Sequence, residues 1–103
     1  MDANEPLYVD CRNGAFTLPE RIFRALSAQV TNGFVYFRED EDSLTISATR
    51  ITGAFRRPLN ARMRAPMFRN ATQLGIVNLR ESIRVMITDG AARVPSVPPP
   101  AAR

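Results

Sequence analysis

Arginine supplies most of the chemistry that this sequence can offer. All fourteen basic side chains are Arg, the chain contains no Lys and no His, and the formal net charge is +4. The planar guanidinium group donates hydrogen bonds in a fixed fork that suits phosphate oxygens and the edges of nucleic-acid bases. These arginines therefore favour contact with a polyanion over catalysis.

The charges are divided unevenly along the chain. Residues 1–42 hold four Arg and eight acidic residues, a net charge of −4, whereas residues 43–103 hold ten Arg and two acidic residues, a net charge of +8. Such asymmetry indicates either a polyanionic partner or self-association of unlike faces. The most basic stretch, 53–69, has no acidic residue. It contains Arg56, Arg57, Arg62, Arg64 and Arg69. These arginines either track phosphate or pair with the acidic half of this chain or of a partner.

The residue types argue against an enzyme. Without His, the chain lacks the commonest general base and the commonest metal ligand. Cys11 is the single cysteine, so no internal disulfide forms, and we interpret it as an unreactive thiol because it has no His to activate it. No glycine pattern for nucleotide phosphates occurs. We expect no catalytic residue, no metal site and no cofactor.

A hairpin and a helix are expected to position the first arginines. Leu7–Val9 and Ala15–Leu18 read as strands on either side of Asn13-Gly14, a turn dipeptide in which both residues tolerate positive φ. Thr17 and Glu20 have the spacing of a capping box. This predicts a helix that starts there, with Pro19 in its first turn, and ends near Gln29.

The middle of the chain predicts two strands and a basic connection. The stretches 34–37 and 43–51 are β-rich, and the acidic run 39–42 between them reads as an exposed turn. Pro58 and Pro66 argue against one continuous helix in the basic stretch. We expect a connection there, followed by an edge strand near Met63–Phe68.

The last third predicts three more strands and a tail. Leu74–Leu79 reads as a strand, and Asn78 and Glu81 repeat the capping-box spacing, which favours one helical turn near 80–82. The alternation of the following apolar residues favours a strand over 83–88. Then come a turn at Asp89-Gly90, a short strand at 91–94 and a Pro-rich tail, 95–103, expected to be disordered or polyproline-like.

Two stretches of the chain are similar to each other. GAFTLPERIFRAL begins at Gly14 and GIVNLRESIRVMI begins at Gly75. The comparison matches Gly14 with Gly75, Leu18 with Leu79, Glu20 with Glu81, and Ile22 with Ile83. We predict a degenerate internal repeat, with units of about 7–51 and 63–94, in a single domain spanning 1–94. The predicted class is mainly β with one short helix (α+β), built as a swapped-hairpin or small β-barrel fold.

The stretch VDCRNGAFTLPERIFRAL, starting at Val9, together with the apolar pattern through Ile51, resembles the AbrB/SpoVT-type swapped-hairpin transcription factors and the related MraZ- and MazE-like proteins. Gly14 matches the turn glycine of that family, and Leu18-Pro19 matches its strand-to-helix junction. Ala15 and Phe23 stand where relatives commonly carry DNA-contacting polar residues. The resemblance implies a DNA-binding dimer in which Arg12 and Arg24 reach the bases.

The leading hypothesis is a cytoplasmic, non-catalytic, dimeric DNA-binding transcriptional regulator. Its expected DNA-binding residues are Arg12, Arg21, Arg24, Arg56, Arg57, Arg62 and Arg64. One alternative is a self-assembling or protein-interaction module that binds no nucleic acid. Another is an antitoxin, against which the Pro-rich tail counts because it lacks an acidic-apolar pattern. That tail could also dock a protein partner through its polyproline form.

Overall fold

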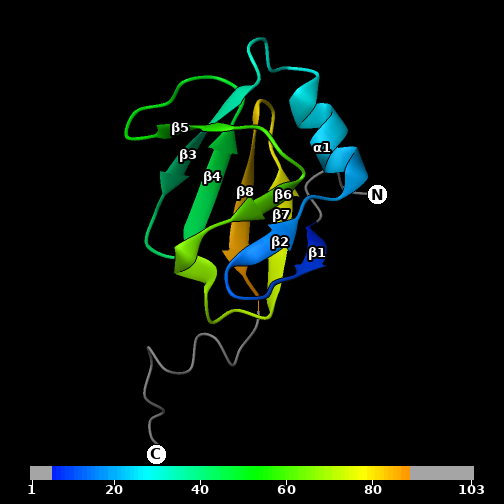
Figure 1. Ribbon diagram of the computed structural model, residues 1–103, viewed down its shortest axis with the longest axis vertical. Helices are drawn as coiled ribbons and strands as arrows, with labels where there is room; N and C mark the ends of the chain where they lie inside the picture. Colours follow the sequence, from blue (N-terminus) through cyan, green and yellow to red (C-terminus); the bar gives the residue numbers. More distant parts are fainter. Residues whose placement is uncertain (1–5, 89–103) are drawn as a thin grey trace, which may run out of the picture.

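The computed structural model describes residues 6–88, which form one α-helix, one 3₁₀ helix and eight strands (Figure 1). The elements in chain order are β1 (Leu7–Asp10), β2 (Ala15–Thr17), α1 (Glu20–Ser27), β3 (Phe34–Glu39), β4 (Ser43–Ser47), β5 (Phe55–Pro58), β6 (Arg62–Arg64), η1 (Pro66–Phe68), β7 (Gln73–Asn78) and β8 (Ser82–Ile87). The turn expected at Asp89-Gly90, the strand at 91–94 and the tail lie outside the described residues.

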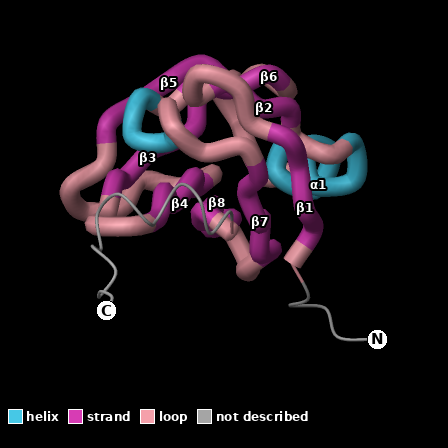
Figure 2. The backbone as a smooth tube through the Cα atoms, turned by 90° about the horizontal axis from the view of Figure 1, so that it is seen from below, coloured by secondary structure: helices cyan, strands magenta, loops and turns pink. Residues whose placement is uncertain are grey.

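The strands form two sheets. Six of them make an antiparallel sheet in the order β1-β7-β8-β4-β3-β5, and β2 pairs with β6 in a separate two-stranded ribbon. Figures 1 and 2 show this ribbon lying across one side of the large sheet, with α1 beside it. The predicted mainly β, α+β class is confirmed. Among residues 6–88 the large sheet is open, with β1 and β5 at its two edges, so the expected closure into a small β-barrel is not found.

One hydrophobic core joins the two layers. Alternate residues of the central strands point into it, including Leu44 and Ile46 of β4 and Ile83 and Val85 of β8, each at most 1% exposed. From the other side come Phe16 and Met63 of the ribbon, Ile22 and Leu26 of α1, and Phe68 of η1. Ile22 and Leu26 are four residues apart, so the short helix buries a single stripe.

Two predictions about the start of the chain are wrong. The strands on either side of Asn13-Gly14 do not form a hairpin beyond the Arg12–Ala15 pair, because β1 turns away to pair with β7 while β2 pairs with β6. The capping box does not form either. Pro19 is the N-cap residue and no side chain caps the helix, since Thr17 is held in β2 opposite Arg62.

The helical turn expected near 80–82 is also absent. A tight turn joins β7 to β8, and the Leu79 N–H donates to the carbonyl oxygen of Ser82 at 2.9 Å. The alternation of Ile83, Val85 and Ile87 decides the structure here, because the first two point into the core from a strand. Over its described residues the second unit of the proposed repeat has no α-helix, so the two units are built differently there.

The basic stretch contains more regular structure than its sequence predicts. Its first half forms β5, an edge strand that pairs with β3 and ends at Pro58, where a missing N–H is tolerated. Its second half forms β6 and then the 3₁₀ turn of η1, in place of one strand over 63–68. The acidic run 39–42 lies at the β3–β4 turn, as predicted, with Asp40 N–H donating to Ser43 at 2.8 Å.

Within residues 6–88 no helix has the length and apolar character needed to cross a lipid bilayer.

Candidate nucleic-acid interface

A two-residue turn anchors the first candidate arginine. Arg12 and Ala15 exchange both backbone hydrogen bonds, at 3.0 and 2.8 Å, while Asn13 and Gly14 adopt positive φ of 52° and 81°. These angles are those of a type I′ turn. Gly14 is required for a second reason, because an added methyl group would lie 2.6 Å from the carbonyl oxygen of Ala65. The Ala65 N–H donates to Gly14 at 2.8 Å, so the turn is fastened to the end of β6.

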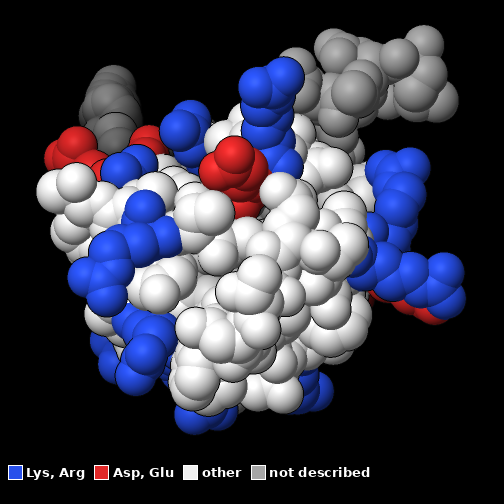
Figure 3. All heavy atoms as spheres, turned by 90° about the horizontal axis from the view of Figure 1, so that it is seen from above, with Lys and Arg blue, Asp and Glu red and all other residues white. Residues whose placement is uncertain are grey.

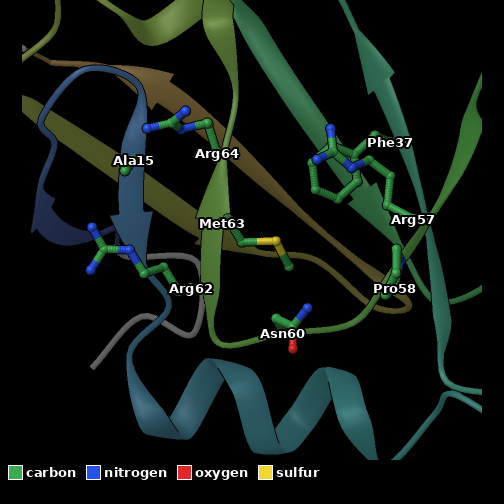
Figure 4. A pocket seen from close by; sticks show the side chains of 8 residues that line it. All are labelled: Ala15, Phe37, Arg57, Pro58, Asn60, Arg62, Met63 and Arg64. Atoms are coloured by element: carbon green, nitrogen blue, oxygen red, sulfur yellow. The ribbon is translucent and has the colours of Figure 1, made fainter.

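Strand register brings three predicted arginines onto one exposed face. Ala15 is the cross-strand partner of both Arg12 and Arg64, so the two arginines flank a small side chain. Arg62 lies two residues before Arg64, opposite Thr17, and the buried Met63 between them points the other way. Figure 4 shows Arg62 and Arg64 extending from β6 on the same side, across β2.

Arg57 reaches the same region from the edge of the large sheet. It lies opposite Val35 in the register, and its guanidinium carbon is 5.2 Å from the centre of the Phe37 ring. A hollow between β5 and β6 is lined by Arg57, Arg62 and Arg64, and no carboxylate of residues 6–88 lines it (Figure 4). A neighbouring hollow is lined by both Arg12 and Arg62, with Asp10 as its carboxylate. We call Arg12, Arg57, Arg62 and Arg64 the basic strip.

The other three predicted residues lie elsewhere. Arg56 projects from the opposite face of β5, because successive side chains of a strand alternate, and its guanidinium carbon is 4.6 Å from the centre of the Phe34 ring. Arg21 and Arg24 are exposed on α1, and Arg24 forms an ion pair with Glu20 one turn earlier. Neither helix arginine lines the hollow between β5 and β6.

Positive charge on the surface is dispersed. Figure 3 shows arginine side chains spread around the rim of one view, with acidic side chains among them. Among residues 6–88 the ion pairs within 4.0 Å are Arg24–Glu20 and Arg38–Asp40. No arginine of the basic strip therefore forms an ion pair with a carboxylate of residues 6–88.

Cys11 has a structural place beneath this surface. It is 7% exposed, and its thiol donates a weak hydrogen bond to the Phe68 carbonyl at a distance of 3.5 Å. Burial raises the pKa of the Cys11 thiol, and the backbone of Gly14 opposes this only in part. The thiol is therefore held in its protonated, poorly nucleophilic form.

Sequence reasoning did not single out Arg50. Its guanidinium carbon lies 5.8 Å from the centre of the Tyr36 ring, on the same face of the sheet as Arg56. The signal that could have found it is the alternation of β3, which places Phe34 and Tyr36 on the face opposite the core residues Val35 and Phe37.

Within residues 6–88 no three His, Cys, Asp or Glu side chains come together as ligands for a metal ion. Comparison of the chain with models of known protein families, with curated proteins and with solved structures finds no match. The geometry of the arginines therefore carries the functional argument.

Proposed function

We propose that this protein is a small, non-catalytic DNA-binding protein that acts as a dimeric transcriptional regulator. The basic strip is the observation that carries the proposal. Its four arginines come from the first turn, β5 and β6, and three of them line a hollow to which the described residues contribute no carboxylate. Arginines that no described carboxylate pairs with suit the phosphates of a nucleic-acid backbone.

Two features help such a strip to bind. Arg57 is held against aromatic rings, with Phe37 at 5.2 Å and the exposed Phe55 at 6.0 Å from its guanidinium carbon. A guanidinium that stacks by its flat face keeps its in-plane N–H donors available for phosphate. Arg62 and Arg64 are two residues apart on a strand, so their side chains repeat at about 6.8 Å, which is about twice the axial rise per phosphate along one DNA strand.

Dimer formation is supported by the open edges of the large sheet. β1 and β5 each present one side without a strand partner among the described residues. Unpaired edges are templates for another chain. The acidic run 39–42 offers a complementary surface for the arginines of a second copy, which keeps the self-assembling module as the second candidate function. Light scattering distinguishes the DNA-binding dimer from the self-assembling module by the mass in solution. Oligomers larger than a dimer that dissociate in salt and bind no DNA support the module.

The test is titration of random duplex DNA at two salt concentrations, followed by fluorescence anisotropy. We expect binding that weakens steeply with salt, and a triple variant Arg57→Gln/Arg62→Gln/Arg64→Gln that lowers the magnitude of the log–log salt slope by about 2–3. The control removes three charges elsewhere, as Arg21→Gln/Arg24→Gln/Arg80→Gln. Circular dichroism confirms that both variants fold.

Three results would overturn this proposal or redirect it. Absence of binding at low salt, or binding indifferent to salt, contradicts a DNA-binding role. Equal losses in both triple variants mean that net charge rather than the basic strip provides the affinity. A larger loss in the control would move the interface to α1, where the family resemblance puts Arg24.

A further inference from the structure

We propose that a second site, on the opposite face of β5 from the basic strip, binds a single phosphate group. The site is a hollow beside the strand, lined by Tyr36, Arg50, Arg56 and the loop 51–54, and we call it the outer hollow. It shares no lining residue with the hollow between β5 and β6. The inference does not depend on the proposed DNA binding.

Both arginines of the outer hollow lie over aromatic rings. The guanidinium carbon of Arg56 lies 4.6 Å from the centre of the Phe34 ring, and that of Arg50 lies 5.8 Å from the centre of the Tyr36 ring. Stacking uses the flat face of a guanidinium and leaves its N–H edges free for a bidentate bond to phosphate. A side chain that is already ordered also loses less rotamer entropy when it binds a ligand.

No described carboxylate neutralises this pair. The lining of the outer hollow contains no Asp or Glu, and neither Arg50 nor Arg56 takes part in an ion pair among residues 6–88. The nearby Arg38 differs from this pair, because its Nε lies 3.7 Å from an Asp40 oxygen. Its Cδ would lie 3.8 Å from a methyl group added at Gly53, which is part of the lining. Two unpaired guanidinium groups therefore face a space without a fixed counter-charge.

The few side chains that line the outer hollow limit the kind of ligand that it can bind. Two arginines beside Tyr36 and Thr52 suit one phosphate, whereas the four arginines of the basic strip suit a polymer. The phosphate can belong to a free small molecule or to the backbone of DNA that passes over the β5 edge. The recognising chemistry is the same in both cases, and the experiment distinguishes them.

The experiment follows the backbone N–H signals of the loop 51–54, which remain in every variant, together with the Nε–Hε signals of Arg50 and Arg56, by NMR in the full chain while inorganic phosphate is added. Sodium chloride at matched ionic strength is the control for general charge screening. We expect saturable shifts with phosphate alone, and apparent binding about tenfold or more weaker in Arg50→Gln/Arg56→Gln. The matched variant Arg80→Gln/Arg84→Gln removes two exposed arginines that line neither hollow, and it should bind phosphate as the unaltered chain does.

Duplex DNA forms the second arm. Shifts of the same two signals with DNA, and a smaller salt slope in Arg50→Gln/Arg56→Gln, assign the phosphate to the DNA backbone. Shifts with inorganic phosphate but not with DNA assign it to a small molecule. Linear shifts that chloride reproduces, or equal weakening in the two double variants, would overturn the proposal. The Arg57, Arg62 and Arg64 variant tests DNA binding separately, so failure of one proposal leaves the other intact.

Discussion

Gly14 and Gly75 begin two similar stretches of sequence, yet the regions around them are built differently. Gly14 has φ of +81° in a tight turn and lies against the backbone of Ala65. Gly75 lies inside β7, paired with Tyr8 on one side and Met86 on the other, and has no positive φ. The first glycine meets a backbone requirement, whereas the second is one residue of a regular strand.

The same contrast continues along both stretches. Leu18 is 3% exposed between β2 and α1, while its counterpart Leu79 is 38% exposed in the β7–β8 turn. Ile22 and Ile83 are both buried, but one projects from a helix and the other from a strand. Only the first stretch contains Pro, whose fixed φ suits the start of a helix. Matching residue types therefore serve unlike structures here.

Replacing each glycine by Ala gives the largest expected difference between the regions. Gly14→Ala should lower the free energy of unfolding by about 2–4 kcal/mol, since a left-handed conformation costs an L-residue 1–2 kcal/mol and the new methyl group meets a carbonyl oxygen. Gly75→Ala should change it by about 1 kcal/mol or less. Its methyl group would lie 2.9 Å from the Thr88 methyl carbon, so Thr88 must shift and weaken its exposed hydrogen bonds to Gln73. Urea unfolding measures both.

The Gly14 variant also tests how the basic strip is held. Because Gly14 bonds to Ala65 directly after β6, its replacement should displace Arg64 and weaken DNA binding, while Gly75→Ala should not. A Gly14→Asn variant is the control, since Asn tolerates positive φ better than Ala but keeps the clash. Equal stability of the two Ala variants would contradict the distinction between the regions.

Cys11 gives a second, smaller contrast, because it lies beside the Gly14 turn and has no cysteine counterpart in the other stretch. Its thiol should react with an alkylating reagent about a hundredfold or more slowly in the native chain than in urea. Burial raises the pKa of this thiol in the folded state, so the unfolded state ionises first. Stability should therefore fall as the pH rises through about 9.0, the ordinary value, and level off above the folded pKa.

The measurement compares the urea midpoint from pH 7 to pH 10 in the unaltered chain and in Cys11→Ala. The difference between them should shrink as the pH rises, because the alanine variant has no thiol to ionise. Rapid alkylation without urea would contradict the burial of Cys11 and the closure of the ribbon over it.

The sequence predicts correctly the turns and the helix, which depend on neighbouring residues. It predicts wrongly the strand pairing, which depends on residues far apart in the chain. The Asn13-Gly14 turn, the helix after Pro19 and the acidic turn at 39–42 follow from local chemistry, and all are present. The pairing of β1 with β7 and of β2 with β6 is non-local, so a simple hairpin was predicted in its place. Long-range pairings of this kind depend on the whole core rather than on a turn dipeptide.

The candidate site shows the same division. Residue type indicated Arg57, Arg62 and Arg64, and the family resemblance indicated Arg12. The register places Arg12, Arg62 and Arg64 on one face, and a shared hollow adds Arg57. Arg56 was grouped with its neighbour Arg57, although the pleat of β5 sends the two side chains to opposite faces. Arg50 was missed because its ring contact depends on Tyr36, fourteen residues earlier.

The smallest expected effect concerns Thr17, which has the spacing of a capping residue but lies in β2. Thr17→Ala should change the free energy of unfolding by no more than about 0.5 kcal/mol, the usual range for an exposed position, whereas loss of a true cap costs about 1 kcal/mol. Asn78→Ala, at the matching place in the second stretch, should be as mild, because Asn78 is an exposed strand residue. Leu18→Ala, at a buried position, is the positive control and should cost about 2–5 kcal/mol. A loss of about 1 kcal/mol or more in Thr17→Ala, together with reduced helical circular dichroism, would show that Thr17 caps α1 in solution. The two stretches would then differ further, since only the first has a helix to cap.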